Sequence, residues 1–129
     1  EAQAAQKIYE PPIRNVLFHS CYDGDTCTVS LPGTHPLFGE RIDVRIAGID
    51  TPEIKGKCAH EKDLALSARD LVNETLATAS NIDLEDLGRD KYFRIGARVI
   101  ADGHDLGAEL LRLRLAVIYN GGTKTATWC

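Results

Sequence analysis

Acidic and basic side chains that could hold a cation and an oxyanion gather in three short segments of the sequence. The first segment is Asp-Gly-Asp-Thr at 23–26, the second runs from Val44 to Glu53, and the third runs from Asp90 to Arg94. Their carboxylates suit a hard divalent cation and the activation of a water molecule, and their guanidinium groups suit the oxygens of a phosphate. The three segments are therefore candidates for one metal-assisted site that cleaves a phosphodiester.

Each segment also has a purely structural interpretation when it is considered singly. Asp-Gly is a strong signal for a hairpin turn. In the stretch 50–53, Asp and Thr can bond nearby backbone, and Pro ends strand pairing. The charged run at 90–94 is typical of a solvated face. A function is indicated only by the combination of the three segments in this order.

Together the three segments resemble the hallmarks of the staphylococcal nuclease (thermonuclease) family. They stand here as DGDT at 23–26, VRIAGIDTPE at 44–53 and DKYFR at 90–94. Phe93 occupies a position where the family usually has Gly. The resemblance covers residues 13–119, and the ending of the chain is similar to that of exported bacterial members without the third, C-terminal helix. It implies an α+β protein built on a five-stranded OB-fold β-barrel with two helices.

The resemblance implies a Ca²⁺ site and a residue that acts on water. Asp25 and Asp50 would supply carboxylate ligands to the ion, and the main-chain carbonyl of Thr51 would be a third ligand. Glu53 would orient or deprotonate the attacking water. Calcium accepts oxygen ligands and tolerates several waters, so a site with only three protein ligands is chemically reasonable.

The resemblance also implies residues that bind the substrate. Arg45 and Arg94 would bind the scissile phosphate and stabilise the charge that develops as the phosphorus becomes five-coordinate. Lys91 and Tyr92 could bind phosphate or stack on a base, although a solvated lysine and a ring packed at the barrel edge explain them equally well. The position that stacks bases in the family falls on Tyr119 or on Asn120.

The resulting hypothesis is a Ca²⁺-dependent nuclease that acts on DNA and RNA. By resemblance it would cut the bond between the 5′-oxygen and phosphorus and leave 3′-phosphate ends. Single-stranded substrate is expected, because an OB-fold groove contacts backbone and splayed bases. One alternative is a catalytically inactive OB-fold module that binds nucleic acid or protein. A second is a domain whose aspartates hold a structural metal, but that alternative leaves both arginines and Glu53 unexplained.

Hydrophobic periodicity predicts five strands and two helices to position these residues. The strands are expected at 13–22, 27–31, 42–46, 82–85 and 93–99, and the helices at 60–79 and 105–115. A helix between the third and fourth of five strands is the order of the OB barrel. Periodicity alone leaves that fold as one option among several.

Length and charge limit the kind of protein. A chain of 129 residues suits one domain, which we place at 13–129 after a flexible lead-in at 1–12. The formal charge of −4 argues against binding through a global basic field. Substrate binding would instead depend on a local basic patch, which would comprise Arg41, Lys55, Lys57 and Lys91. We expect a monomer without a membrane-spanning segment.

Four cysteines in a short chain suggest disulfides and an oxidising compartment. Of the three connectivities, Cys21–Cys27 with Cys58–Cys129 requires least of the chain. The alternative is four reduced thiols that pack as small apolar groups. The sequence begins at Glu1 without Met, which suits a processed N-terminus or a chain boundary. We therefore expect a secreted or periplasmic protein.

Overall fold

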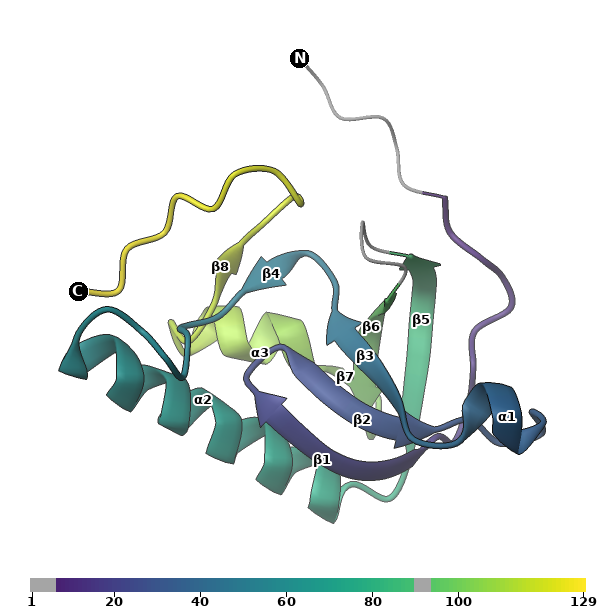
Figure 1. Ribbon diagram of the computed structural model, residues 1–129. Coiled ribbons are helices and arrows are strands. Elements are labelled where there is room, and N and C mark those ends of the chain that lie inside the picture. Colours follow the sequence, from purple (N-terminus) through teal and green to yellow (C-terminus); the bar gives the residue numbers. More distant parts are fainter. Residues whose placement is uncertain (1–6, 90–93) are drawn as a thin grey trace.

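The computed structural model describes residues 7–89 and 94–129 and shows a curled half-barrel sheet with three helices (Figure 1). The main sheet has the strand order β1-β2-β3-β6-β5, and the short β7 pairs with β6. These strands are β1 (Leu17–Asp23), β2 (Thr26–Ser30), β3 (Ile42–Ile46), β5 (Ile82–Arg89), β6 (Ile95–Ala101) and β7 (His104–Asp105). Neighbours are antiparallel except β3 and β6, which run parallel. A mixed α+β fold with an OB-like sheet is thereby confirmed.

The strands form where apolar and polar residues alternate. Cys27 and Val29 in β2 and Val44 and Ile46 in β3 are buried, while the residues between them are more exposed. Side chains point to opposite faces of a strand in turn, so this alternation places one face of each strand in the core. The strands predicted at 27–31 and 42–46 are confirmed to within a residue.

The prediction for the first strand began too early. β1 starts at Leu17, and Ile13 makes an isolated bridge to Leu84 of β5 instead. Asn15 lies between them with a φ of 56°, in the left-handed region, and this conformation interrupts extended backbone. The N-terminal segment thus pairs with β5, with Tyr9 N–H donating to Leu87 O at 2.7 Å.

The two predicted helices are present, with bounds close to those expected. The helix α2 (Ala59–Thr78) follows Cys58, whose sulfur accepts a bond from Glu61 N–H as an N-cap. It buries the apolar stripe of Ala65, Ala68, Val72 and Leu76, which recur at three- and four-residue steps, and it lies along β1 (Figure 1). The helix α3 is Leu106–Arg112, and its N-cap is Asp105, the first residue of the predicted helix at 105–115.

Several short elements were not predicted. The helix α1 (Pro36–Gly39) lies between the predicted strands at 27–31 and 42–46, and Pro36 stands at its start, where the lack of an N–H costs nothing. β4 (Ile49–Asp50) and β8 (Val117–Ile118) form a separate two-stranded sheet. Strands of two residues are too short to leave a period in the sequence. Residues 119–129 form no helix or strand.

Both predicted disulfides are confirmed. Cys21–Cys27 joins β1 to β2 near the turn between them, and Cys58–Cys129 ties the last residue to the N-cap of α2. None of the helices in the described part of the chain is long and apolar enough to cross a membrane.

Candidate functional site

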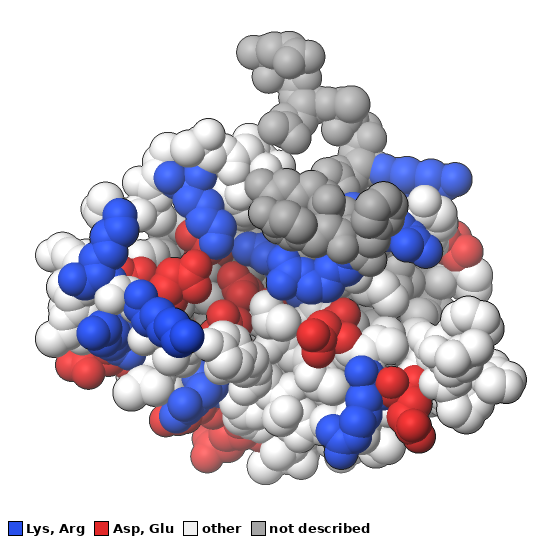
Figure 2. Space-filling model, in the orientation of Figure 1, with Lys and Arg blue, Asp and Glu red and all other residues white. Residues whose placement is uncertain are grey.

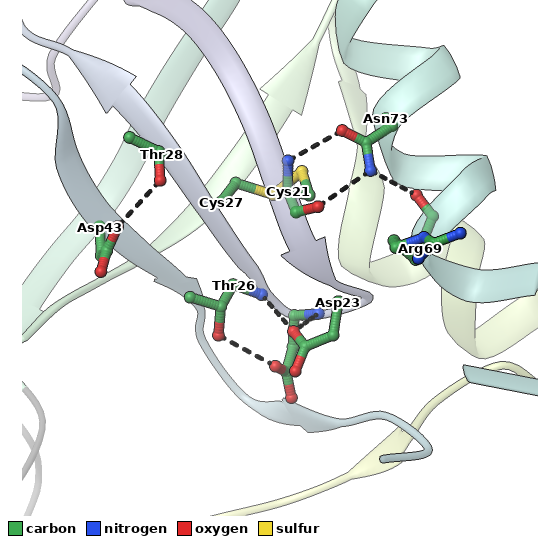
Figure 3. Close-up of a disulfide and its surroundings, with 9 residues drawn as sticks. Cys21, Asp23, Thr26, Cys27, Thr28, Asp43, Arg69 and Asn73 are labelled. Carbon is green, nitrogen blue, oxygen red and sulfur yellow. Dashed lines mark hydrogen bonds between the residues drawn. A yellow bond between two sulfur atoms is a disulfide. The ribbon is translucent and has the colours of Figure 1, made fainter. Parts of the chain in front are cut away.

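The turn at 23–26 joins β1 to β2 and is held by its first aspartate (Figure 3). Asp23 Oδ1 accepts bonds from Asp25 N–H at 3.2 Å and Thr26 N–H at 3.0 Å. This is the turn chemistry that an Asp at the first position supplies. Cys21 and Cys27 pair directly across the two strands, so the disulfide fixes the hairpin next to the turn. The backbone that carries Asp25 is therefore tightly constrained.

Gly24 lets this turn approach the helix and the end of β4. A Cβ at position 24 would lie 2.8 Å from Ala68 Cβ and 3.0 Å from Thr51 Cγ2. Carbon atoms pack at about 3.5–4.0 Å, so a side chain larger than hydrogen does not fit without movement. The glycine of the DGDT segment is therefore needed for the close contact that brings Asp25 to the segment containing Asp50 and Thr51.

Asn73 joins the same hairpin to α2, and the sequence did not point to it (Figure 3). Its Oδ1 accepts from Cys21 N–H at 2.8 Å, and its Nδ2 donates to Cys21 O at 3.0 Å and to Arg69 O at 2.9 Å. The signal that could have revealed it is an asparagine within a long helix, where this residue is unfavourable unless its amide is used. It holds β1 against the helix.

Arg45 lies between the two predicted metal aspartates. Its Nη2 is 3.3 Å from Asp25 Oδ2 and 4.0 Å from Asp50 Oδ1. Asp25 and Asp50 are 7% and 5% exposed, so a guanidinium beside them offsets charge that would otherwise be costly to bury. The ring of Tyr119 lies under this guanidinium, with 5.5 Å between Arg45 Cζ and the ring centroid. The structure thus brings both aspartates and Arg45 together.

Asp50 belongs to β4, and the residues after it lead into the loop before α2. Asp50 pairs with Val117 of β8, and Thr51 is 2% exposed. Asp50 Oδ1 is fully buried and accepts no hydrogen bond from the described residues. A buried oxygen of this kind is normally satisfied, so it is the atom in the site that most needs a partner.

Glu53 is exposed, and Glu61 of α2 supports its backbone. Glu61 Oε2 accepts from Glu53 N–H at 3.1 Å, and its Oε1 accepts from Lys57 N–H at 2.9 Å. These bonds, first that from Lys57 and then that from Glu53, lower the pKa of Glu61. Gly56 leaves space for this carboxylate, because a Cβ there would lie 2.5 Å from Glu61 Cδ. Glu61 therefore fixes the loop that presents Glu53.

Lys124 is a further residue of the site that the sequence analysis missed. Its Nζ lies 3.0 Å from Asp50 Oδ1 and 3.6 Å from Glu53 Oε1. Burial lowers its pKa, but the direct contact of its ammonium with the Asp50 carboxylate, and then the negative charges of Asp50 and Glu53, outweigh that effect and raise the pKa, so Lys124 remains a cation. No pattern around position 124 indicated this placement, which depends on the path of the C-terminal tail.

Arg94 comes directly before β6, the strand that pairs with β3 in the sheet. The parallel register pairs Val44 with Ile95 and Arg45 with Gly96. Gly96 thus lies on the same face as Arg45, and Arg94 stands two residues before Gly96, at the entry to β6. Arg94 is half-buried. The other two predicted substrate-binding residues, Lys91 and Tyr92, lie outside the described residues.

Two acidic residues, Asp23 and Asp25, lie close together in the turn between β1 and β2. Burial, and after it the charge of Asp25, raises the pKa of Asp23 to about 7. Asp23 is 8% exposed, so water does little to relieve the repulsion between the two carboxylates.

In Figure 2, acidic side chains gather in a hollow with Lys and Arg side chains on either side of it. The exposed Lys55 and Lys57 lie in the loop that contains Glu53.

The side chains of this site fit a hard cation with few protein ligands. The described residues contain no cluster of three or more His, Cys, Asp and Glu arranged to hold a metal. However, two buried carboxylates converge, one of their oxygens accepts no hydrogen bond, and two protein cations occupy their neighbourhood. An oxygen-ligated ion that keeps several waters requires no more than this donor set.

Two comparisons with known proteins bear on this site. The staphylococcal nuclease homologue family model matches residues 43–127, which include Arg45, Asp50, Glu53 and Lys124 but not Asp25. A protein of the fission yeast Schizosaccharomyces pombe, described as a probable endonuclease, is 34% identical over 92 residues. That match covers 66% of this chain and 40% of the yeast protein, so the chain spans well under half of its relative's length.

Proposed function

Because this chain belongs to the staphylococcal nuclease homologue family, we propose that it is a Ca²⁺-dependent nuclease that hydrolyses phosphodiester bonds of DNA and RNA. The observation that best supports the proposal is the convergence of Arg45 with Asp25 and Asp50, which are both buried. Burial of two carboxylates is costly for stability, and a role in holding a cation explains why they are there. Cleavage of the 5′-oxygen–phosphorus bond, with 3′-phosphate products, is part of the proposal.

Asp25, Asp50 and the carbonyl of Thr51 would hold the ion. When bound there, Ca²⁺ would neutralise charge on the phosphate and make water more acidic. The three groups come from the β1–β2 turn and from the end of β4, and the contact that Gly24 permits keeps these two segments together. The protein's contribution is a rigid arrangement of oxygens that forms before substrate binds.

Arg45 and Arg94 would hold the scissile phosphate. Arg94 stands at the entry to β6, which pairs with the strand that contains Arg45, and a planar guanidinium can bind two phosphate oxygens at once. The ring of Tyr119 limits how far Arg45 can move. Two fixed positive groups at this face would stabilise the additional negative charge of the five-coordinate transition state.

Glu53 would orient the attacking water or accept its proton. Its carboxylate is 56% exposed and can therefore reach a water at the mouth of the site. The bond from Glu53 N–H to Glu61 holds its backbone in place. A carboxylate that is mobile only in its side chain is suited to proton transfer at a fixed phosphate.

The substrate is proposed to be single-stranded or frayed nucleic acid, bound by a monomer. An OB-like sheet contacts the backbone and splayed bases of such strands, and Tyr119 beside Arg45 is a ring on which a base could stack. Binding would depend on local lysines and arginines in a chain of net charge −4, so it should weaken as salt rises. The two disulfides support a location outside the cytoplasm.

Cleavage of polymer tests the proposal directly. The protein is incubated with heat-denatured DNA and with RNA, in Ca²⁺ or in chelator, and the loss of polymer is followed. We expect cleavage in Ca²⁺ alone. The absence of cleavage with Ca²⁺ would overturn the nuclease and favour an inactive binding module, and cleavage that persists in chelator would overturn the metal requirement.

Variants assign the activity to this site. Glu53→Gln and Arg94→Ala should each lower turnover about a hundredfold or more, because each removes a group that would stabilise the transition state more strongly than the bound substrate. Glu74→Gln changes an exposed glutamate in α2 and is the matched control for Glu53. Circular dichroism checks that the variants fold. Normal activity of either site variant would contradict the role given to that residue.

A further inference from the structure

The C-terminal tail, residues 119–129, is a strap fixed at both ends. At its start, Tyr119 N–H donates to Gly48 O at 2.9 Å, and Tyr119 Oη donates to Gly122 O. At its end, Cys129 is bonded to Cys58. The tail follows β8, which pairs with β4, and it ends near the start of α2, so it spans the loop between β4 and α2 (Figure 1). Its two attachments restrict where the residues between them can go.

Lys124 is the residue of this strap that enters the site. Its ammonium approaches Asp50 Oδ1 at 3.0 Å and Glu53 Oε1 at 3.6 Å, and the ring of Tyr119 lies 5.7 Å from it. Lys124 thus contacts both a proposed metal ligand and the proposed base. Its side chain is 47% exposed, whereas that of Asp50 is 7% exposed. Lys124 therefore reaches the site from the solvent side, and the carboxylate of Asp50 is buried beneath it.

The contact with Asp50 neutralises charge without completing a hydrogen bond. Asp50 Oδ1 lies at ion-pair distance from Lys124 Nζ, yet no hydrogen bond of acceptable geometry reaches this buried oxygen from the described residues. An ammonium in this position offsets the charge of the Asp50 carboxylate but does not satisfy the hydrogen-bonding capacity of Oδ1. A divalent ion with flexible coordination would use the same oxygen better.

We propose that Lys124 is a built-in competitor for the divalent cation at Asp50, and that the Cys58–Cys129 disulfide keeps it in place. The inference rests on the proposed function, because it concerns the cation site of the nuclease. A lysine ammonium and a Ca²⁺ ion at one carboxylate oxygen repel each other, so each weakens the binding of the other. Binding of the ion therefore favours withdrawal of Lys124.

Withdrawal is feasible because little holds the strap between its ends. Residues 123, 124 and 125 are exposed, and the tail contains no helix or strand that must break. The disulfide keeps the lysine near Asp50 at a high effective concentration, so competition is intramolecular. Lys124 therefore sets the concentration of cation at which the site fills, and reduction of the disulfide lowers that concentration.

Calcium affinity without substrate tests this inference. Isothermal titration calorimetry of the whole chain gives the Kd for wild type, Lys124→Gln, Lys124→Arg and a Cys58→Ser/Cys129→Ser double variant. Loss of a partly exposed ion pair should lower the Kd of Lys124→Gln roughly fivefold. Lys124→Arg should stay near wild type, and the double variant should lie between. Lys55→Gln is the control, since it removes one exposed lysine charge from the same loop region and should change the Kd less than twofold.

A second measurement follows the lysine itself. In chelator, the amine of Lys124 should react with an acetylating N-hydroxysuccinimide ester more slowly than that of Lys55, and Ca²⁺ should remove this difference, as read by mass spectrometry. Unchanged reactivity, or a Kd of Lys124→Gln equal to or higher than that of wild type, would overturn the inference. If wild type binds Ca²⁺ and cleaves nucleic acid in that case, the proposed function stands without it. Failure of wild type to bind Ca²⁺ overturns both.

Discussion

Substitution of Gly24 by alanine tests whether the DGDT turn positions the site through steric contact. The added Cβ would lie 2.8 Å from Ala68 Cβ, 3.0 Å from Thr51 Cγ2 and 3.1 Å from Thr51 Cβ. Neither neighbour can rotate away: Ala68 has no further side chain and lies in the middle of α2, and Thr51 is 2% exposed. The turn must therefore move by several tenths of an ångström or more, and Asp25 moves with it.

The size of the effect follows from this overlap. Insertion of one methyl group into a packed site of this kind costs about 1–3 kcal/mol of unfolding free energy. Misplacement of a catalytic group by about 1 Å can cost about a hundredfold in rate. We expect Gly24→Ala to lose stability within that range, to bind Ca²⁺ more weakly, and to cleave denatured DNA tens of times more slowly or worse. Urea denaturation, calorimetry and the cleavage assay measure the three quantities.

Two further variants isolate the steric cause. Gly96→Ala adds the same methyl group in β6, where the nearest atoms would lie 3.9 and 4.0 Å away, and it should cost little. Adding Ala68→Gly to Gly24→Ala removes the closest contact, so it should recover part of the activity even though glycine within a helix costs about 1 kcal/mol of its own. The reasoning is refuted if Gly24→Ala matches wild type in stability and rate, or if Ala68→Gly restores nothing.

Two other predictions follow from the supports of the site. Glu61→Gln should lower turnover with little change in KM, because one of its two backbone donors then faces an amide N–H instead of a carboxylate oxygen and the loop that carries Glu53 loosens. The pKa of Glu61 is lowered in the folded protein, so its stabilising effect is present above the ordinary pKa of 4.5 and is lost as the pH falls below that value. The melting temperatures of wild type and Glu61→Gln should therefore converge toward about pH 3. Curves of melting temperature against pH that stay parallel would contradict this. Replacement of Cys21 and Cys27 by serine opens a short loop and should cost about 2 kcal/mol of unfolding free energy in urea, and a loss near zero would show that Asn73 alone holds the hairpin.

Most of the fold could be predicted because its elements leave a local period. The alternation around Val44 and the three- and four-residue steps around Val72 each reflect one buried face, and the structure buries those residues. The errors occur where a local period does not decide the backbone. Asn15 interrupts the first strand through a single left-handed residue, and β4 and β8 gain their pairing only from each other.

The site could be predicted in part for a related reason. Asp25, Arg45, Asp50 and Glu53 lie within two short motifs, so their residue types and order could be recognised without knowledge of the fold. Their convergence depends on a contact between a turn, a strand end and a helix. That contact is visible in the sequence only as Gly24, which the Asp-Gly pair marks as part of a turn and which the structure shows to be a point of close approach.

The sequence by itself determined the residue types that can hold a cation, a phosphate and a water, and the strands and helices that carry them. These properties are local, since a motif or a hydrophobic period extends over a few neighbouring residues. Only the tertiary structure showed that Glu61 holds the loop of Glu53, that Asn73 holds the hairpin, and that Lys124 reaches Asp50. Each of these contacts joins residues that a loop, a helix or a disulfide brings together. The local sequence around each residue does not reveal how close the two residues are in space.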